Sequence, residues 1–162
     1  AEHSDDEIEV VLAHELAHHV HHDIWKAIAL EAGLIVLGFY LADLTLGAAV
    51  GHFGLSSVDD IAGLPLLVLT GGAVSLALVP LVHALSRAHE RRADRYALNL
   101  TGNPDAFMSA IRRLSRQNLA EERPSRLVEI LFCSHPPVAE RLEAARAWPP
   151  GRADPCGPRE SS

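Results

Sequence analysis

Apolar residues are concentrated in two long stretches of the chain instead of recurring at helical spacing along its whole length. Between Ala32 and Val50 the only formal charge is Asp43, and between Ile61 and Ser86 there is none. A bilayer core about 30 Å thick is crossed by roughly 20 mostly apolar helical residues, so both stretches are long enough. A buried helix of a soluble domain is the alternative, and it is stronger for the first stretch because a carboxylate in mid-bilayer is costly.

A short polar link over residues 52–60 joins the two stretches, which predicts an antiparallel transmembrane hairpin at about residues 28–86. Both outer ends of such a hairpin emerge on the same side of the membrane. The link contains no Lys or Arg, whereas basic residues flank the outer ends: Lys26, Arg87, Arg91, Arg92 and Arg95. Because Lys and Arg are enriched on the cytoplasmic side, we expect the polar bulk of the chain to face the cytoplasm.

Signals for a helix precede the hairpin. Ser4 and Glu7 have the spacing of a capping box, which predicts a helix that starts there and continues through Trp25 towards the membrane. The apolar face of this helix is expected to consist of Ile8, Val11, Leu12 and Leu16.

Further helices are predicted after the hairpin. Residues 87–100 have a helical pattern that ends at Thr101 and Gly102. Asn103 and Pro104 then supply an N-cap and a proline in the first turn of another helix. The expected core face of that helix is Phe107, Ile111 and Leu114, and a last helix is predicted to follow Pro136 and Pro137.

Composition narrows the class of protein. The 162 residues include 14 Lys and Arg against 21 Asp and Glu, which gives a formal net charge of −7. We place one domain at residues 1–148 and a tail with the composition of disordered segments at 149–162. An acidic chain lacks the basic face that nucleic-acid binding requires, so no nucleic-acid partner is expected. Two cysteines are too few for a disulfide framework, whereas ten histidines are many for this length.

The residues from His14 to His18 form an H-E-x-x-H motif inside the first predicted helix. Residues four apart lie on one face of a helix, so the two imidazoles can bind the same Zn²⁺. Glu15 lies beside them and can take a proton from a water that zinc has acidified, which is the general-base arrangement of a zinc peptidase. The alternative is a solvated, histidine-rich helix face.

A third zinc ligand is expected just after the hairpin, because a catalytic zinc site has three protein ligands and an open position. The hairpin returns the chain to the side of the two histidines at Glu90, which is therefore the expected carboxylate ligand. Asp94, one helical turn later, can accept a hydrogen bond from the non-metal nitrogen of a ligating histidine. The alternative is that Glu90 and Asp94 form salt bridges with neighbouring arginines.

The combination of VLAHELAHH, two apolar spans, SRAHERRADRYALNLTGNPDAF and SHPPVAERL resembles the membrane zinc metallopeptidases that comprise the type I CAAX prenyl protease and the HtpX heat-shock protease. The resemblance implies a mostly α-helical, gluzincin-like metallopeptidase core interrupted by the transmembrane hairpin. It implies one Zn²⁺ per chain, with a site made of the ligands His14, His18 and Glu90, the catalytic base Glu15 and the supporting Asp94.

The same resemblance implies that His135 and Arg141, in a His-Pro-Pro-x-x-x-Arg stretch, lie by the active site and help to hold the substrate or the oxyanion. Their alternative is a turn histidine and a helix-surface arginine. Members of this family carry membrane segments and a substrate-pairing edge strand before the H-E-x-x-H helix, whereas this sequence begins at the helix cap.

We therefore expect a multi-pass integral membrane zinc endopeptidase that acts on protein or peptide substrates, with its catalytic side in the cytoplasm. Prenylated C-termini and damaged membrane proteins both remain open as substrates, and the oligomeric state is left open. The rival from another class is a non-catalytic membrane scaffold, or an inactive fragment of a larger peptidase. A third hypothesis is a soluble metallopeptidase in which both apolar helices are buried in the core.

Overall fold

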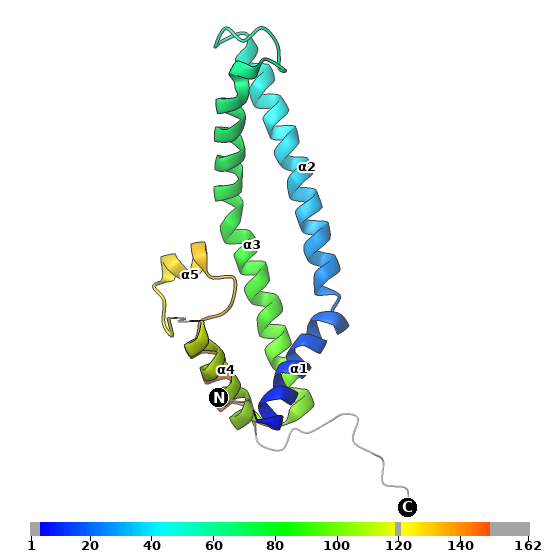
Figure 1. The fold of residues 1–162 in the computed structure, drawn as a ribbon, viewed down its shortest axis with the longest axis vertical. Coiled ribbons are helices and arrows are strands. Elements are labelled where there is room, and N and C mark those ends of the chain that lie inside the picture. Colours follow the sequence, from blue (N-terminus) through cyan, green and yellow to red (C-terminus); the bar gives the residue numbers. More distant parts are fainter. Residues whose placement is uncertain (1–3, 119–120, 150–162) are drawn as a thin grey trace, which may run out of the picture. The chain divides into compact units, whose positions relative to one another are not determined.

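The computed structural model describes residues 4–118 and 121–149, and in that part of the chain every regular element is a helix. The prediction of a mostly α-helical fold is confirmed. Figure 1 shows the elements in chain order: α1 (Asp5–Val20), α2 (Asp23–Val50), the short 3₁₀ helix η1 (Ile61–Gly63), α3 (Leu64–Thr101), α4 (Pro104–Gln117), α5 (Arg126–Phe132) and α6 (Val138–Arg146).

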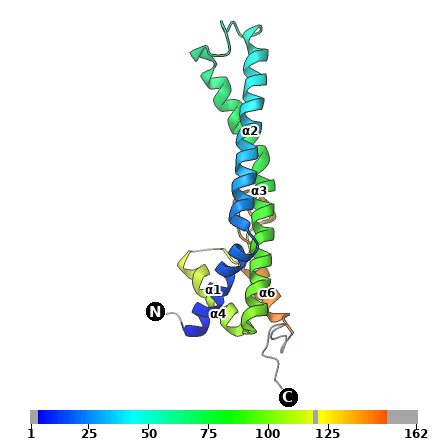
Figure 2. The ribbon, with the colours of Figure 1, turned by 90° about the vertical axis from the view of Figure 1, so that its right-hand side faces the viewer.

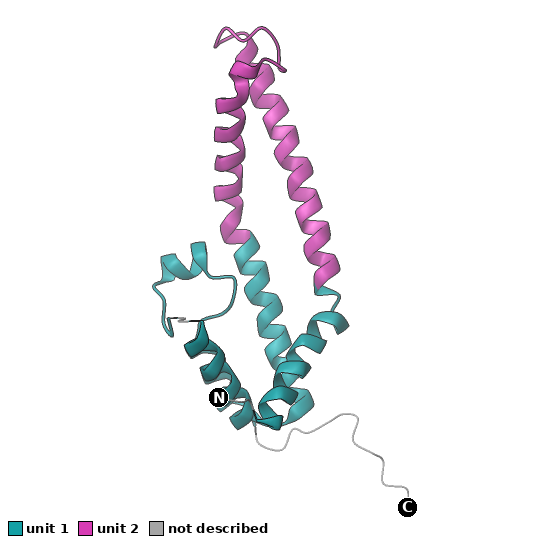
Figure 3. Cartoon of the chain, in the orientation of Figure 1, with its two compact units in different colours: residues 1–23, 82–162 teal, residues 24–81 magenta. Residues whose placement is uncertain are grey.

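The chain divides into two compact units, which Figure 3 shows in different colours. One unit consists of residues 24–81, and the other combines residues 1–23 with residues 82–162. The long helix α3 contributes its first half to the former unit and its second half to the latter.

The unit of residues 24–81 contains nearly all of α2 and the first half of α3, which belong to the two helices that are long and apolar enough to cross a membrane. Large apolar side chains along these helices are exposed, among them Val36, Phe39, Val68 and Leu76. A core helix of a soluble domain would bury such side chains. The exposure therefore favours membrane-spanning helices over the hypothesis of two buried core helices.

The other unit has its own small core, formed where α1, α4 and α6 meet the second half of α3. Helix α4 packs against both α1 and α6, and Figure 2 shows these helices beside the lower part of α3. Phe107 of α4 is 1% exposed and is the largest fully buried side chain in the described part of the chain. The other buried members of this core are Val10, Ala13, Ala97, Leu98, Ala106, Ile111, Leu142 and Ala145.

Helix α1 begins as predicted but ends earlier than predicted. The Ser4 hydroxyl accepts a hydrogen bond from the Glu7 N–H at 3.2 Å, and the Ser4 N–H donates to the Glu7 carboxylate at 3.2 Å, which completes the capping box. The predicted continuation through Trp25 is wrong, because α1 ends at Val20 and α2 begins at Asp23. Between them His22 has φ +55°, a left-handed conformation that a helix cannot contain.

The predicted apolar face of α1 is also wrong. Of its four residues, Ile8, Leu12 and Leu16 are 46–63% exposed and Val11 is half-buried, whereas the buried positions of α1 are Glu7, Val10, Ala13 and Ala17. Ala13 is buried because a small side chain allows neighbouring helices to approach closely. The Glu7 carboxylate is buried because it forms an ion pair with Arg113 and accepts a hydrogen bond from Ser109. Paired groups therefore satisfy a buried carboxylate that a hydrophobicity pattern assigns to the surface.

After the hairpin one predicted helix start is wrong, whereas a predicted helix end and a predicted N-cap are confirmed. Residues 87–100 do not form a separate helix, since α3 runs without interruption from Leu64 to Thr101 with Pro80 inside it. It ends at the predicted place, where Gly102 adopts φ +60°, a conformation that glycine reaches without steric cost. Asn103 caps α4 as predicted, with its side-chain oxygen 3.0 Å from the Ala106 N–H.

The C-terminal part of the chain contains one helix that was predicted and one that was not. Helix α6 begins at Val138, directly after the two prolines as expected. Helix α5 was not predicted; it is seven residues long and is capped by the Ser125 hydroxyl, which accepts from the Val128 N–H. The predicted domain at residues 1–148 stays a prediction, and residues 150–162 of the predicted tail lie outside the described residues.

Candidate metal centre

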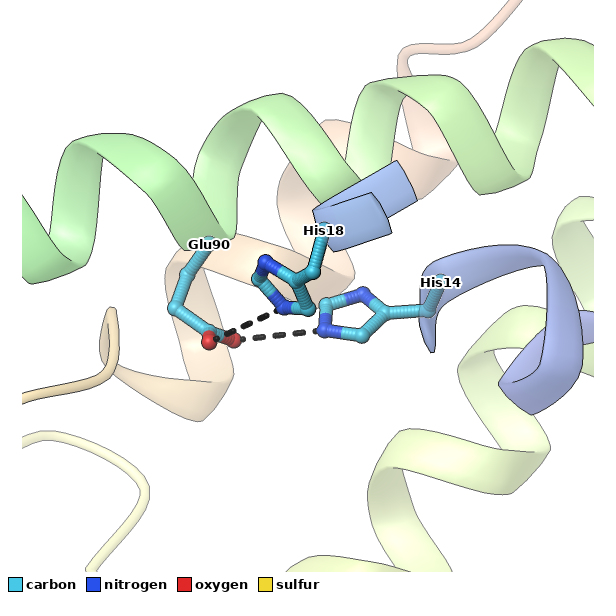
Figure 4. A group of neighbouring side chains, drawn as sticks. All are labelled: His14, His18 and Glu90. Carbon is cyan, nitrogen blue, oxygen red and sulfur yellow. Dashed lines mark ion pairs between the residues drawn. The ribbon is translucent and has the colours of Figure 1, made fainter. Parts of the chain in front are cut away.

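Three predicted metal ligands converge in the unit that contains α1 (Figure 4). His14 and His18 are one turn apart on α1, with ring centroids 5.1 Å apart, and Glu90 reaches them from α3. The His14 Nε2 is 3.4 Å from one Glu90 carboxylate oxygen, and the His18 Nε2 is 3.6 Å from the other. One donor atom from each residue lies within 4.8 Å of the other two.

This donor set fits a divalent metal ion of the zinc type. Two imidazoles and one glutamate are a known ligand set of catalytic zinc sites, which leave a fourth position open. Ligand atoms about 2.0–2.1 Å from a tetrahedral ion are about 3.4 Å from one another. The His14 and His18 Nε2 atoms are 3.4 and 3.6 Å from the two different oxygens of Glu90, and one ligand atom of each residue lies within 4.8 Å of the others, so small side-chain adjustments would bring the three residues onto one ion.

Asp94 and Arg141 support His14 from behind. The His14 Nδ1, which points away from Glu90, is 3.0 Å from the Asp94 carboxylate. Arg141 of α6 donates two hydrogen bonds to that same carboxylate, at 2.8 and 2.6 Å. Asp94 therefore lies beside the His14 Nδ1, the position expected from the sequence for a carboxylate that orients a ligand histidine. Arg141 reaches the site by binding Asp94.

The charges around His14 determine its protonation in the metal-free protein. Burial by itself lowers the pKa of His14, but the carboxylates of Asp94 and Glu90 outweigh burial and raise this pKa to about 9. For Glu90 the directions are reversed: burial raises its pKa, because burial disfavours the charged carboxylate. The hydrogen bonds from His135 and His14 outweigh burial and hold the pKa of Glu90 well below its ordinary value. Glu90 is therefore ionised, as a metal ligand must be.

His135 completes the ring of side chains around Glu90. It lies in the segment before α6, where its Nδ1 is 3.1 Å from a Glu90 carboxylate oxygen. This contact raises the pKa of His135. The side chain is 65% exposed, so it faces solvent on its other side.

Sequence reasoning did not single out Asp23, the first residue of α2. Its carboxylate is 3.1 Å from the His18 Nδ1, and it also forms an ion pair with Arg92 of α3. The prediction of one continuous helix does not include this contact, because in such a helix Asp23 and His18 point in different directions. The available signal was a carboxylate shortly after the H-E-x-x-H motif, next to two further histidines that could mark a helix end.

A cleft of about 870 Å³ opens beside these residues, and it lies within the same unit. Glu15 is exposed and lines the cleft together with the three candidate ligands, His135 and Arg141. The remaining wall is mostly apolar and includes Val11, Ile111, Leu114, Val128, Phe132, Pro136 and Val138. The predicted site residues that line it therefore share a space large enough for a peptide segment.

The sequence of the chain is similar to those of known peptidases. The sequence profile of peptidase family M48 matches residues 1–149. The chain is 33% identical over 145 residues to the uncharacterized metalloprotease YhfN of Bacillus subtilis, covering 87% of this chain and 34% of YhfN.

Homologs of the protease HtpX are similar as well. The homolog of Syntrophotalea carbinolica is 35% identical over 158 residues, which cover 86% of this chain and 55% of the homolog. The homolog of Methanopyrus kandleri is 32% identical over 160 residues, covering 88% of this chain and 48% of the homolog. The chain thus spans about a third of YhfN and about half of these two HtpX homologs.

Proposed function

Because the chain belongs to peptidase family M48, we propose that it carries the metal site of a membrane-bound, zinc-dependent endopeptidase. The observation that carries the proposal is the convergence of His14, His18 and Glu90 on one point in the wall of an open cleft. Zn²⁺ held there, one ion per chain, would polarise the scissile carbonyl and acidify the attacking water.

Glu15 is the proposed general base. Its residue is exposed and lines the cleft beside the candidate ligand histidines. In the proposed reaction it accepts a proton from the attacking water and delivers a proton to the nitrogen of the leaving amine as the carbon–nitrogen bond breaks. The carboxylate is then ionised again and ready for the next turnover.

His135 and Arg141 are proposed to stabilise negative charge that develops on the carbonyl oxygen. Both line the cleft, and Arg141 is held in place by its two hydrogen bonds to Asp94. A positive group that is already fixed where charge develops stabilises a transition state without further reorganisation. The contact of His135 with Glu90 keeps this imidazole beside the same site.

The proposed substrates are membrane-associated or prenylated proteins. The mostly apolar wall of the cleft favours substrate segments with large apolar side chains. We also propose that the protein crosses the membrane more than once, with the site on the cytoplasmic side, because the basic residues lie at the outer ends of the two apolar stretches.

The competing proposal is a non-catalytic membrane scaffold or an inactive part of a larger peptidase. The exposed Glu15 favours catalysis, because a purely structural zinc site needs no base beside an open coordination position. The length of the relatives matters for the test, since this chain spans about half of the two HtpX homologs. The activity is therefore best measured on the full-length protein in detergent.

The experiment compares Glu15→Gln with the wild type. The variant should keep about one zinc per chain and lose cleavage of quenched fluorescent peptides by roughly 10²–10⁴-fold, because only the proton acceptor is removed. Glu9→Gln, at another exposed glutamate of α1, is the matched control and should cleave normally. Full cleavage by Glu15→Gln would refute the mechanism, and tight zinc binding by His14→Ala would refute the ligand assignment.

A further inference from the structure

Both candidate ligand histidines meet an aspartate on the nitrogen that faces away from Glu90. The His14 Nδ1 is 3.0 Å from Asp94, and the His18 Nδ1 is 3.1 Å from Asp23. Both aspartates are 6% exposed. Each of them is paired with an arginine from another helix, Asp94 with Arg141 and Asp23 with Arg92.

The break between α1 and α2 makes the contact of Asp23 with His18 possible. In a continuous helix, successive residues are rotated by about 100°, so a residue five positions later points about 140° away from the first. Here α1 ends at Val20 and His22 has φ +55°, which redirects the chain before Asp23. A left-handed conformation at a residue other than glycine is strained and persists only where the surroundings compensate for it.

The contact with Asp23 determines which ring nitrogen of His18 carries a proton. An ionised carboxylate only accepts hydrogen bonds, so the contact with Asp23 requires the proton of His18 on Nδ1. In the neutral imidazole the Nε2, which faces Glu90 at 3.6 Å, then has the free electron pair that a metal ligand needs. Asp94 lies on the corresponding side of His14, 3.0 Å from its Nδ1.

We infer that Asp23 is a positioning residue of the metal site: it holds the His18 ring in the orientation and tautomer in which Nε2 binds the ion. The inference rests on the proposed zinc site and extends it to the first residue of α2. It differs from a merely structural role, in which Asp23 serves only to pair with Arg92.

The test measures the zinc dissociation constant of the full-length protein in detergent by competition with a chelator. Asp23→Ala should weaken zinc binding about 10- to 100-fold, the usual effect of losing a carboxylate that orients a ligand histidine. Asp23→Asn should recover most of the affinity, because its amide oxygen still accepts from Nδ1–H. Asp43→Ala, at another acidic residue of α2, is the matched control and should bind zinc as the wild type does.

Arg92→Gln separates the two roles, because it removes the ion pair and leaves the carboxylate beside His18. We expect this variant to lose less zinc affinity than Asp23→Ala. The absorption spectrum of bound Co²⁺, which reports ligand geometry, should change in Asp23→Ala and be restored in Asp23→Asn.

Two results would overturn the inference: wild-type zinc affinity in Asp23→Ala, or equal losses in Asp23→Ala, Asp23→Asn and Arg92→Gln. If the wild type binds no zinc, the proposed function itself fails, which is a distinguishable outcome. Where Asp23→Ala does not fold, Asp23→Asn and Arg92→Gln still decide the question, because both keep an oxygen beside the His18 Nδ1: both should bind zinc nearly as the wild type does, and a tenfold loss in each would overturn the inference.

Discussion

Zinc binding should become tighter as the pH rises from 7 to 9, because His14 must lose a proton before it can bind a metal. In the metal-free protein burial lowers the pKa of His14, but Asp94 at 3.0 Å and Glu90 at 3.4 Å raise it to about 9. At pH 7, about two units lower, roughly 1% of His14 is neutral. The apparent zinc affinity at pH 7 is therefore about 100-fold below its value in the fully deprotonated protein, or about 2.7 kcal/mol.

The assay is a chelator competition between pH 7 and 9 at constant ionic strength, corrected for protonation of the chelator. The dissociation constant should fall about ninefold from pH 7 to pH 8 and about fivefold from pH 8 to pH 9, where half of His14 is still protonated. Asp94→Asn removes one of the charges that raise the pKa of His14, so its dissociation constant should change less steeply with pH. A change of less than threefold across the whole range in the wild type would show that the two carboxylates do not hold a proton on His14.

The same proton stabilises the metal-free fold. The folded-state pKa of His14, about 9, lies above its ordinary value of 6.5, so the proton contributes stability that is fully present below pH 6.5 and is lost as the pH rises through 9. The loss is about 3 kcal/mol at most. Thermal unfolding of the chelator-treated protein should thus occur at a lower temperature at pH 9 than at pH 6.5, whereas the zinc-loaded protein should not show this trend.

Three substitutions test the site and the core. Glu90→Ala should lower zinc content from about one ion per chain to well below that, by elemental analysis, and an unchanged content would exclude a site shared by α1 and α3. Phe107→Ala should lower the free energy of unfolding by about 3–5 kcal/mol because it empties the centre of the core, and a loss below 1 kcal/mol would contradict that packing. Glu7→Ala should cost about 1–3 kcal/mol because it removes the buried acceptor of the Ser109 hydrogen bond and the ion pair with the part-exposed Arg113, whereas Glu9→Ala, on the exposed face of α1, should change unfolding by less than about 0.5 kcal/mol.

The convergence of the three candidate metal ligands could be predicted from the sequence because each step rests on local spacing or on chain length. His14 and His18 share a helix face by their separation of four, and the hairpin returns the chain to them at Glu90. The roles of His135 and Arg141 came only from a resemblance, since no spacing relates them to α1. Their contacts with Glu90 and Asp94 depend on how the segment before α6, and α6 itself, pack beside α3.

The burial of α1 could not be predicted from its hydrophobic pattern. The pattern assigned Leu12 to the core, yet this side chain is 63% exposed, whereas Glu7 is buried. A pattern measures only the free energy of transfer from water, and it omits the partners that make a buried carboxylate tolerable. Ser109 and Arg113 supply those partners from a helix that lies far along the chain.

The sequence by itself determined the two apolar helices, the capping box, the end of α3 and the identity of the three candidate ligands, since each depends on interactions between near neighbours or on apolar length. Only the tertiary structure decided which groups stand behind the ligands. The left-handed turn at His22 brings Asp23 to His18, and the packing of α6 brings Arg141 to Asp94. These contacts join residues whose separation carries no periodic signal, so they exist only once the helices have packed.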